Sequence, residues 1–233
     1  MPQARGKSRH GQVNRTTLPT GTRLPASIPP PDAMPEGLDP DAHRTARAYH
    51  EAGHAVADHA YGRPIGFALV EDGGSGIVQP MPGVVPEELW TPEMFDAHAI
   101  GLLSGRIAEC FWFGVDGATT DLEFDADVFV YGRDEGDSIG DGDLYVHALG
   151  KLGTPPTETE IDDRALDARP AHSEPAYELI QSRWPAVDVL AMELLGTPGG
   201  LSGEAISAII EAAGFEPLAD LWMERRAELA DDG

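Results

Sequence analysis

One segment of this chain carries clear signals for where a helix begins and ends. Asp39-Pro40 supplies an N-cap followed by the residue best tolerated in the first helical turn, and Gly62 follows the end of the pattern. His50 and His54 lie inside this segment, four residues apart, so a helix projects both imidazoles from one face. The sequence therefore predicts a long helix with two histidines that can meet at a single third group.

The rest of the pattern is also helical, apart from one small β element. Residues 65–70 and 77–79 flank a Gly-rich turn and predict a short hairpin. Thr91-Pro92 begins a second long helix that ends before Gly114; it is apolar around most of its circumference, so we expect it at the centre of the core. Further helical segments are expected over 121–131, at a turn over 144–149, over 175–195 with a break at Pro185, over 203–213 with Ser202 as cap, and over 217–230. The fold class is therefore mainly α with one β-hairpin.

Composition predicts one folded domain behind a leader. Hydrophobic residues make up 41% of the 233 residues and charged residues 24%, which is enough for a packed core. Residues 1–38 are rich in Pro, Gly, Thr and Arg without apolar periodicity, so we expect a disordered or extended leader before a domain over 39–233. The single cysteine, Cys110, excludes an intramolecular disulfide framework.

Charge and hydropathy exclude several classes of partner. The net charge of −24 disfavours binding to nucleic acid, because phosphates repel an acidic surface. Residues 1–31 hold five basic residues and no acidic one, a pattern more typical of a solvated leader than of an anion-binding tail. No apolar run approaches the roughly 18 residues of a membrane span, and no signal peptide is recognisable. We therefore expect a cytoplasmic protein without a membrane span.

The pentapeptide from His50 to His54 has the spacing His-Glu-x-x-His. Two imidazoles at this spacing can hold one Zn²⁺, and Glu51 would lie beside the open coordination position, where it can accept a proton from a zinc-bound water. The alternative is a pair of incidental histidines. Gly53 favours the functional interpretation: it costs a helix about 1 kcal/mol relative to alanine, which indicates close packing by another element.

The pentapeptide does not identify the third ligand. A metzincin would need glycine at 57 and histidine at 60, where this chain has Ala57 and Ala60, so that class is excluded. Glu109 on the second long helix is the candidate for a gluzincin-like site, and an aspartate is the other possibility. The residues alone leave both open.

Four blocks of the sequence resemble the FtsH family, the membrane-bound AAA+ zinc metalloproteases. Residues 48–56 resemble the zinc helix of that family, and Leu-Leu-Ser-Gly-Arg-Ile-Ala-Glu at 102–109 is similar to its Leu-Leu-Gly-Gly-Arg-x-Ala-Glu block. Thr-Thr-Asp-Leu at 119–122 resembles the block that supplies the third zinc ligand. The segments 190–195 and 201–206 are similar to the closing helices.

The resemblance implies an FtsH-peptidase-like helical zincin domain with zinc as cofactor. It implies His50, His54 and Asp121 as zinc ligands and Glu51 as catalytic base, with Glu109 as an outer carboxylate that pairs with Arg106. The activity implied is that of a zinc metalloendopeptidase acting on peptides or unstructured segments. The alternative is a non-catalytic, metal-stabilised interaction module of the same fold.

This chain departs from the family pattern, because it has neither membrane helices nor an ATPase module. Its Gly-Lys pairs at 6–7 and 150–151 lack the remainder of a P-loop, so the sequence excludes an ATP site of this kind. A separate ATPase chain or a homo-oligomer is therefore the candidate partner besides the substrate.

The remaining polar residues favour structural interpretations. The acidic residues of the Gly/Asp-rich stretch do not match a calcium loop and predict a solvated loop: Asp134, Glu135, Asp137, Asp141 and Asp143. His59 is expected at the surface, and three further histidines have no partner at ligand spacing: His98, His147 and His172. The strand over 65–70 could offer an edge to an extended peptide, although a purely structural hairpin is the simpler prediction.

Overall fold

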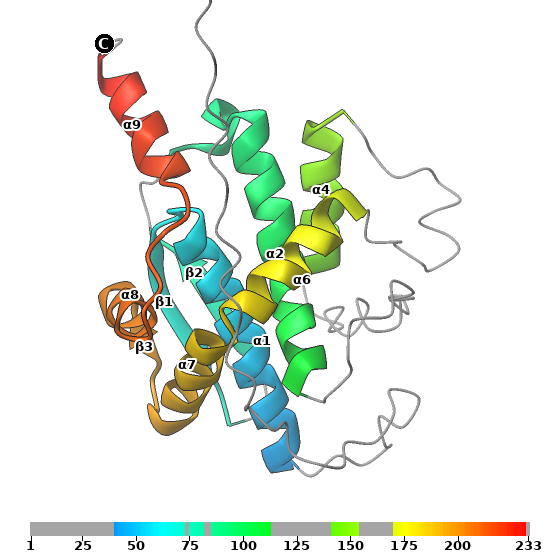
Figure 1. The fold of residues 1–233 in the computed structure, drawn as a ribbon, viewed down its shortest axis with the longest axis vertical. Coiled ribbons are helices and arrows are strands. Elements are labelled where there is room, and N and C mark those ends of the chain that lie inside the picture. Colours follow the sequence, from blue (N-terminus) through cyan, green and yellow to red (C-terminus); the bar gives the residue numbers. More distant parts are fainter. Residues whose placement is uncertain (1–39, 73–74, 82–84, 113–140, 154–169, 232–233) are drawn as a thin grey trace, which may run out of the picture.

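Two long helices form the centre of the molecule. The computed structural model describes residues 40–72, 75–81, 85–112, 141–153 and 170–231. Helices α1 (Pro40–Ala60) and α2 (Pro92–Trp112) lie side by side, as Figure 1 shows. The other elements surround them: η2 (Glu87–Leu89), α4 (Asp141–Lys151), α6 (Pro170–Ser182), α7 (Trp184–Gly196), α8 (Gly203–Ala212) and α9 (Leu221–Asp231).

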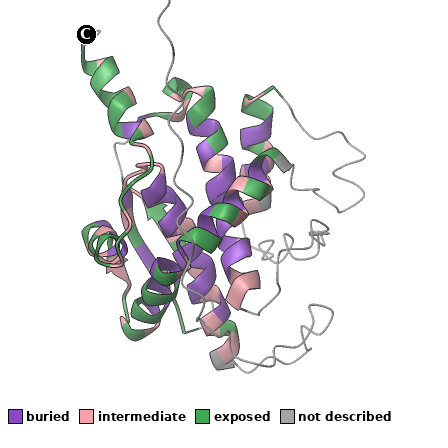
Figure 2. Ribbon diagram, in the orientation of Figure 1, coloured by how far each residue is buried: buried purple, intermediate pink, exposed green. Residues whose placement is uncertain are grey.

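The core lies where α1 and α2 meet their neighbours. Val56 on α1 and Leu103 and Ile107 on α2 are almost completely buried, and Figure 2 shows the buried residues concentrated along these two helices. The two helices begin and end close to the predicted residues. Thr91 caps α2 as expected, because its Oγ1 accepts a hydrogen bond from the N–H of Met94 at 3.4 Å.

A small antiparallel sheet covers one side of α1. The predicted hairpin is present as β1 (Ile65–Val70) and β2 (Gly76–Pro80), and a third strand, β3 (Leu201–Ser202), was not predicted. The strand order is β2-β1-β3, with Ala68 opposite Val78 and Leu201. The structural hairpin that the sequence favoured is confirmed, and the alternative of a free edge on residues 65–70 does not hold, because β1 is the central strand.

The C-terminal helices follow the predicted signals, although several of their ends lie a few residues from the predicted positions. The break expected near Pro185 lies at Arg183, and the proline occupies the first turn of α7. Ser202 caps α8 as predicted, since its Oγ accepts a hydrogen bond from the N–H of Ala205 at 3.3 Å. Helix α9 begins later than expected, because the N–H groups of residues 218 and 219 both donate to the carbonyl of Ala60 at the end of α1.

Helix α4 differs from its prediction in length and in role. The turn expected over 144–149 is an eleven-residue helix that begins at Asp141, so Asp141 does not belong to a solvated acidic loop. The predicted leader over 1–38 and the predicted helix over 121–131 lie outside the described residues. The described part is mainly helical with one small sheet, as predicted, and none of its helices is long and apolar enough to cross a membrane.

Candidate metal centre

Glycines allow α1 and α2 to approach closely at the site. A Cβ atom on Gly53 would lie 2.5 Å from the carbonyl oxygen of Ser104 and 2.7 Å from Cβ of Ala108. A Cβ atom on Gly105 would overlap the imidazole of His54. The steric need predicted for Gly53 is thus confirmed, and it holds His54 directly against the backbone of α2.

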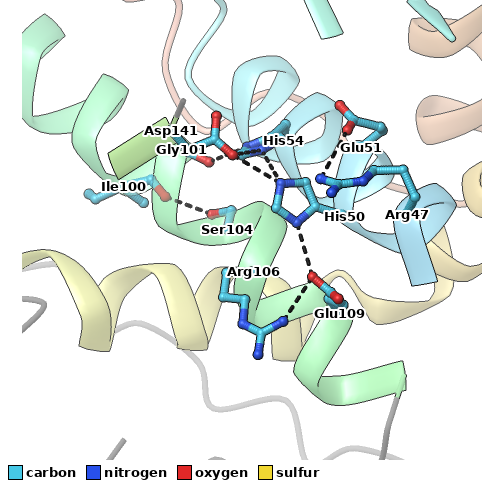
Figure 3. Close-up of polar contacts among 10 residues, drawn as sticks. All are labelled: Arg47, His50, Glu51, His54, Ile100, Gly101, Ser104, Arg106, Glu109 and Asp141. Carbon is cyan, nitrogen blue, oxygen red and sulfur yellow. Dashed lines mark hydrogen bonds and ion pairs between the residues drawn. The ribbon is translucent and has the colours of Figure 1, made fainter. Parts of the chain in front are cut away.

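Three side chains converge on one point between α1 and α4. The Nε2 atoms of His50 and His54 lie 3.0 Å apart, and Oδ2 of Asp141 lies 3.0 Å from the first and 3.2 Å from the second. Figure 3 shows all three atoms directed toward one another. Within the described residues, these three side chains form the group of histidine and acidic residues that can hold a metal ion.

The outer nitrogens of both imidazoles have oxygen acceptors. Nδ1 of His54 lies 2.9 Å from the carbonyl oxygen of Gly101, and Nδ1 of His50 lies 3.2 Å from Oε2 of Glu109. Glu109 is in turn held by Arg106 at 3.0 Å, the pairing that the sequence suggested. In a neutral imidazole these acceptors favour the proton on Nδ1, so that Nε2 is the nitrogen that can bind a cation, the usual arrangement of metal-binding histidines.

The electrostatics of the cluster favour a cation at the convergence point. Burial by itself lowers the pKa of His54, but the Asp141 carboxylate raises it to about 9. Burial would raise the pKa of Asp141, yet the two imidazoles hold it well below its usual range. The pKa of Glu109 is about 2, because His50 and Arg106 outweigh the effect of burial. The site therefore holds two ionised carboxylates around a pair of imidazoles.

The donor set and its spacing fit zinc. Two imidazole nitrogens and one carboxylate oxygen are ligands that Zn²⁺ prefers. Ligands at about 2.0–2.1 Å from a tetrahedral centre lie roughly 3.3–3.4 Å from one another. The separations of 3.0–3.2 Å between the three atoms are close to that value. His50, His54 and Asp141 therefore form a donor set that could hold a metal ion, with a spacing compatible with zinc, and they are the three ligand atoms that the described residues supply at this point.

Glu51 is buried beside this cluster without joining it. Its side chain is 4% exposed, and Oε1 lies 3.9 Å from Nη1 of Arg47. Strand β2 passes over it so closely that a Cβ atom on Gly76 would lie 2.6 Å from Cγ and from Oε1 of Glu51. Burial raises the pKa of Glu51, although the two neighbouring imidazoles and Arg47 oppose this effect. A carboxylate shifted in this direction is a better proton acceptor near neutral pH.

The two carboxylates proposed from the sequence have different positions. Glu109 contacts Nδ1 of His50, on the outer side of the ring, and so does not reach the convergence point. Asp121 lies outside the described residues, and its role as third ligand stays a prediction. Sequence reasoning missed Asp141, although one signal was present: it precedes the apolar positions Leu144, Tyr145, Ala148 and Leu149, whose spacing is helical.

Three histidines outside the cluster have partners in the surrounding structure. His59 was expected at the surface, but it is 6% exposed, because α1 is covered on that side as well. Its Nε2 lies 3.8 Å from Oε1 of Glu211. Nδ1 of His98 lies 3.0 Å from Nη1 of Arg63, and Nε2 of His147 lies 2.7 Å from Oε1 of Glu87.

Comparison with known proteins does not assign a family. No protein-family model matches the sequence, and no curated protein matches it either. The functional assignment therefore depends on the geometry of the site, and the resemblance to the FtsH family stays a prediction.

Proposed function

We propose that this protein is a zinc-dependent metalloendopeptidase. The observation that carries the proposal is the convergence of His50 Nε2, His54 Nε2 and Asp141 Oδ2 next to the buried carboxylate of Glu51. A zinc ion in such a site polarises a carbonyl group and lowers the pKa of a bound water toward 7.

The residues of the chain have separate roles in the proposed reaction. Glu51 accepts a proton at its carboxylate as water attacks the amide carbonyl, and later delivers it to the leaving nitrogen. Glu109 and the carbonyl of Gly101 orient the two imidazoles through their Nδ1 atoms. Arg47 stays near Glu51 and favours its ionised form.

The position of β2 favours a peptide as substrate. Among the described residues, β2 is the outer strand of the sheet on the side of Glu51. The N–H of Glu71 donates to the carbonyl of Ser75 at 2.8 Å, so these two residues form a hydrogen-bonded pair. Hydrogen-bonded pairs alternate along an antiparallel ladder, and the register therefore makes Leu69–Ile77 the next one. Gly76 and Val78 therefore direct their N–H and C=O groups away from β1, where an extended peptide can pair with them.

The test of the proposal separates metal binding from catalysis. Glu51→Gln should keep the zinc while lowering cleavage of an unfolded substrate such as casein about a hundredfold or more, because general-base catalysis contributes roughly 10² to 10⁴. The matched control is Glu88→Gln, at an exposed position on η2, which should cleave casein at the normal rate. Zinc content by atomic absorption and cleavage by gel electrophoresis are the measurements. Unchanged cleavage by the Glu51 variant would contradict the proposal.

A non-catalytic module stabilised by the same metal is the second candidate. A purely structural zinc site is usually closed by four protein ligands, whereas the described residues provide three at this point. Glu51 also has no use in a structural site, because burying a carboxylate without a strong partner is costly. Full zinc content with no hydrolysis of any unfolded substrate would favour this second candidate. A homo-oligomer, a separate ATPase partner and a cytoplasmic location stay predictions.

A further inference from the structure

The third metal ligand belongs to an element that cannot stand alone. His50 and His54 are on a 21-residue helix in the core, whereas Asp141 is the first residue of α4, which has only eleven. Isolated helices of this length are marginal in water, and Gly142 and Gly150 lower the helical propensity further. The position of Asp141 therefore depends on how α4 is attached to the rest of the molecule.

An apolar stripe and a chain of three polar side chains attach α4. Tyr145, Ala148 and Leu149 lie on one face of the helix and are 0–1% exposed. The hydroxyl of Tyr145 lies 3.1 Å from Nδ1 of His172 on α6, and Nε2 of the same imidazole lies 3.1 Å from Oδ1 of Asp96 on α2. We call Tyr145, His172 and Asp96 the α4 anchor.

The donors and acceptors along the α4 anchor follow from the chemistry of its three side chains. Asp96 can only accept, so Nε2–H of His172 donates to it and Nδ1 is left as an acceptor. The Tyr145 hydroxyl then donates to Nδ1, so both buried side chains have partners. His172 is 6% exposed and its ring meets that of Tyr145 edge-on, with centroids 5.8 Å apart. Three helices are thus joined through one buried imidazole.

The anchor lies one helical turn from the metal centre. Tyr145 follows Asp141 by four residues, so the two side chains project from the same face of α4. The surface contact of α4 is different in kind, since Glu87 pairs with His147 at 2.7 Å and Lys151 at 3.3 Å in an exposed position. Exposed ion pairs contribute little to stability, so the buried contact between Tyr145 and His172 is the polar contact of α4 able to fix the helix, while the exposed carboxylate of Asp96 orients the imidazole.

We propose that Tyr145, His172 and Asp96 are positioning residues for the metal centre: they dock α4 against α2 and α6 and so hold Asp141 at the two histidines. This inference rests on the proposed metal site. Because only the docked form of α4 presents all three ligands, the apparent zinc affinity falls with the docked fraction. Zinc and the anchor then stabilise the same arrangement, so each should compensate in part for the loss of the other.

The experiment measures zinc affinity and local exchange in the full chain. Tyr145→Phe removes only the hydroxyl, and it should weaken zinc binding about tenfold by competition with a chromogenic chelator. In the zinc-free variant, amide hydrogen exchange over residues 144–151 should accelerate, and zinc should slow it again. The matched control is Ser202→Ala, which removes the cap of α8 and destabilises a region away from α4. It should leave both readouts over α4 unchanged.

A third variant distinguishes failure of this inference from failure of the metal site. Asp141→Asn should weaken zinc binding far more than Tyr145→Phe does. If Asp141→Asn weakens binding and Tyr145→Phe behaves like Ser202→Ala in both readouts, the anchor has no positioning role and the metal site stands. If Asp141→Asn has no effect on zinc affinity, the proposed ligand set is wrong and the inference falls with it.

Discussion

The α1–α2 contact and the α4 contact hold the same candidate site by different means. At the α1–α2 contact, Gly53 and Gly105 bring one helix against the backbone and imidazole of the other, and nothing larger fits. At the α4 contact, attachment depends on side chains, and among the described residues no atom outside the neighbouring backbone of α4 lies within 4 Å of where a Cβ atom on Gly150 would be. His50 and His54 therefore belong to a rigid helix contact, whereas the position of Asp141 depends on a contact made by a few side chains.

Because of this difference, the histidine pair and the third ligand should respond differently to substitutions. His50 and His54 are four residues apart on the same helix, so helical geometry fixes the distance between them. The distance from either histidine to Asp141 is fixed only when α4 is docked. We expect the histidine pair to be robust to substitutions around it and the third ligand to be sensitive to them.

The largest effect is expected from removing the third ligand. Asp141→Asn should reduce zinc affinity by more than the 10–100-fold typical of an outer partner, because it removes a charged ligand and not a supporting contact. Asp121→Asn is the matched comparison, since the resemblance to the FtsH family implies that residue instead. Isothermal titration of folded, zinc-free protein measures both affinities. A strong loss at Asp121 and none at Asp141 would show that the ligand lies outside the described residues.

An intermediate effect is expected from adding a methyl group to each contact. Gly53→Ala should lower the free energy of unfolding by about 1–3 kcal/mol, since α1 and α2 must separate to admit the new atom. Gly150→Ala on α4 should raise it by up to about 1 kcal/mol, because the position is open and alanine is the better helix former. Urea unfolding measures both values. Equal stabilities of the two variants would show that the α1–α2 contact is looser than described.

A smaller effect concerns the response of the α1–α2 region to acid. Burial and the neighbouring Arg63 lower the pKa of His98 on α2 to about 3. Since the unfolded chain binds this proton near pH 6.5 and the folded protein does not, stability falls as the pH drops from about 6.5 toward 3. His98→Gln should therefore reduce the slope of unfolding free energy against pH by up to about 1.4 kcal/mol per unit in this range.

The control for this pH dependence is a histidine of the other region. His147→Gln removes an exposed histidine of α4, whose pairing with Glu87 should contribute little to stability. Urea unfolding of the chelator-treated proteins at several pH values between 7 and 5 gives the slopes. A slope for His98→Gln equal to that of the natural protein would mean that His98 is not held neutral by its surroundings.

Local sequence signals predicted the helices and strands whose ends are marked by a capping residue, a proline or glycines. Thr91 and Ser202 act as caps, Pro185 lies at a break, and the Gly-rich turn joins β1 to β2. Each of these signals acts within a few residues of the chain, so it can be recognised without knowing the fold. The same holds for the steric role of Gly53, which was visible as a helix position where glycine is costly.

Features that depend on residues far away in the sequence were not predicted, or were predicted wrongly. The two-residue strand β3 is too short for any periodicity and exists because Leu201 and Ser202 pair with β1. His59 has the sequence context of a surface residue, yet α1 is covered on nearly every side. Asp141 looked like one acid among many, because the apolar spacing after it indicates a helix but does not indicate which of the neighbouring aspartates faces the two histidines.

The sequence by itself therefore determined that a helix would carry two histidines and a glutamate at the spacing of a zinc site, because helical periodicity is a local property. Only the tertiary structure decided which carboxylate of the described residues completes the group, because the third ligand comes from a helix 87 residues further along the chain from His54. That choice depends on the docking of α4 through Tyr145 and His172, and such docking is a property of packed surfaces that no short stretch of sequence contains.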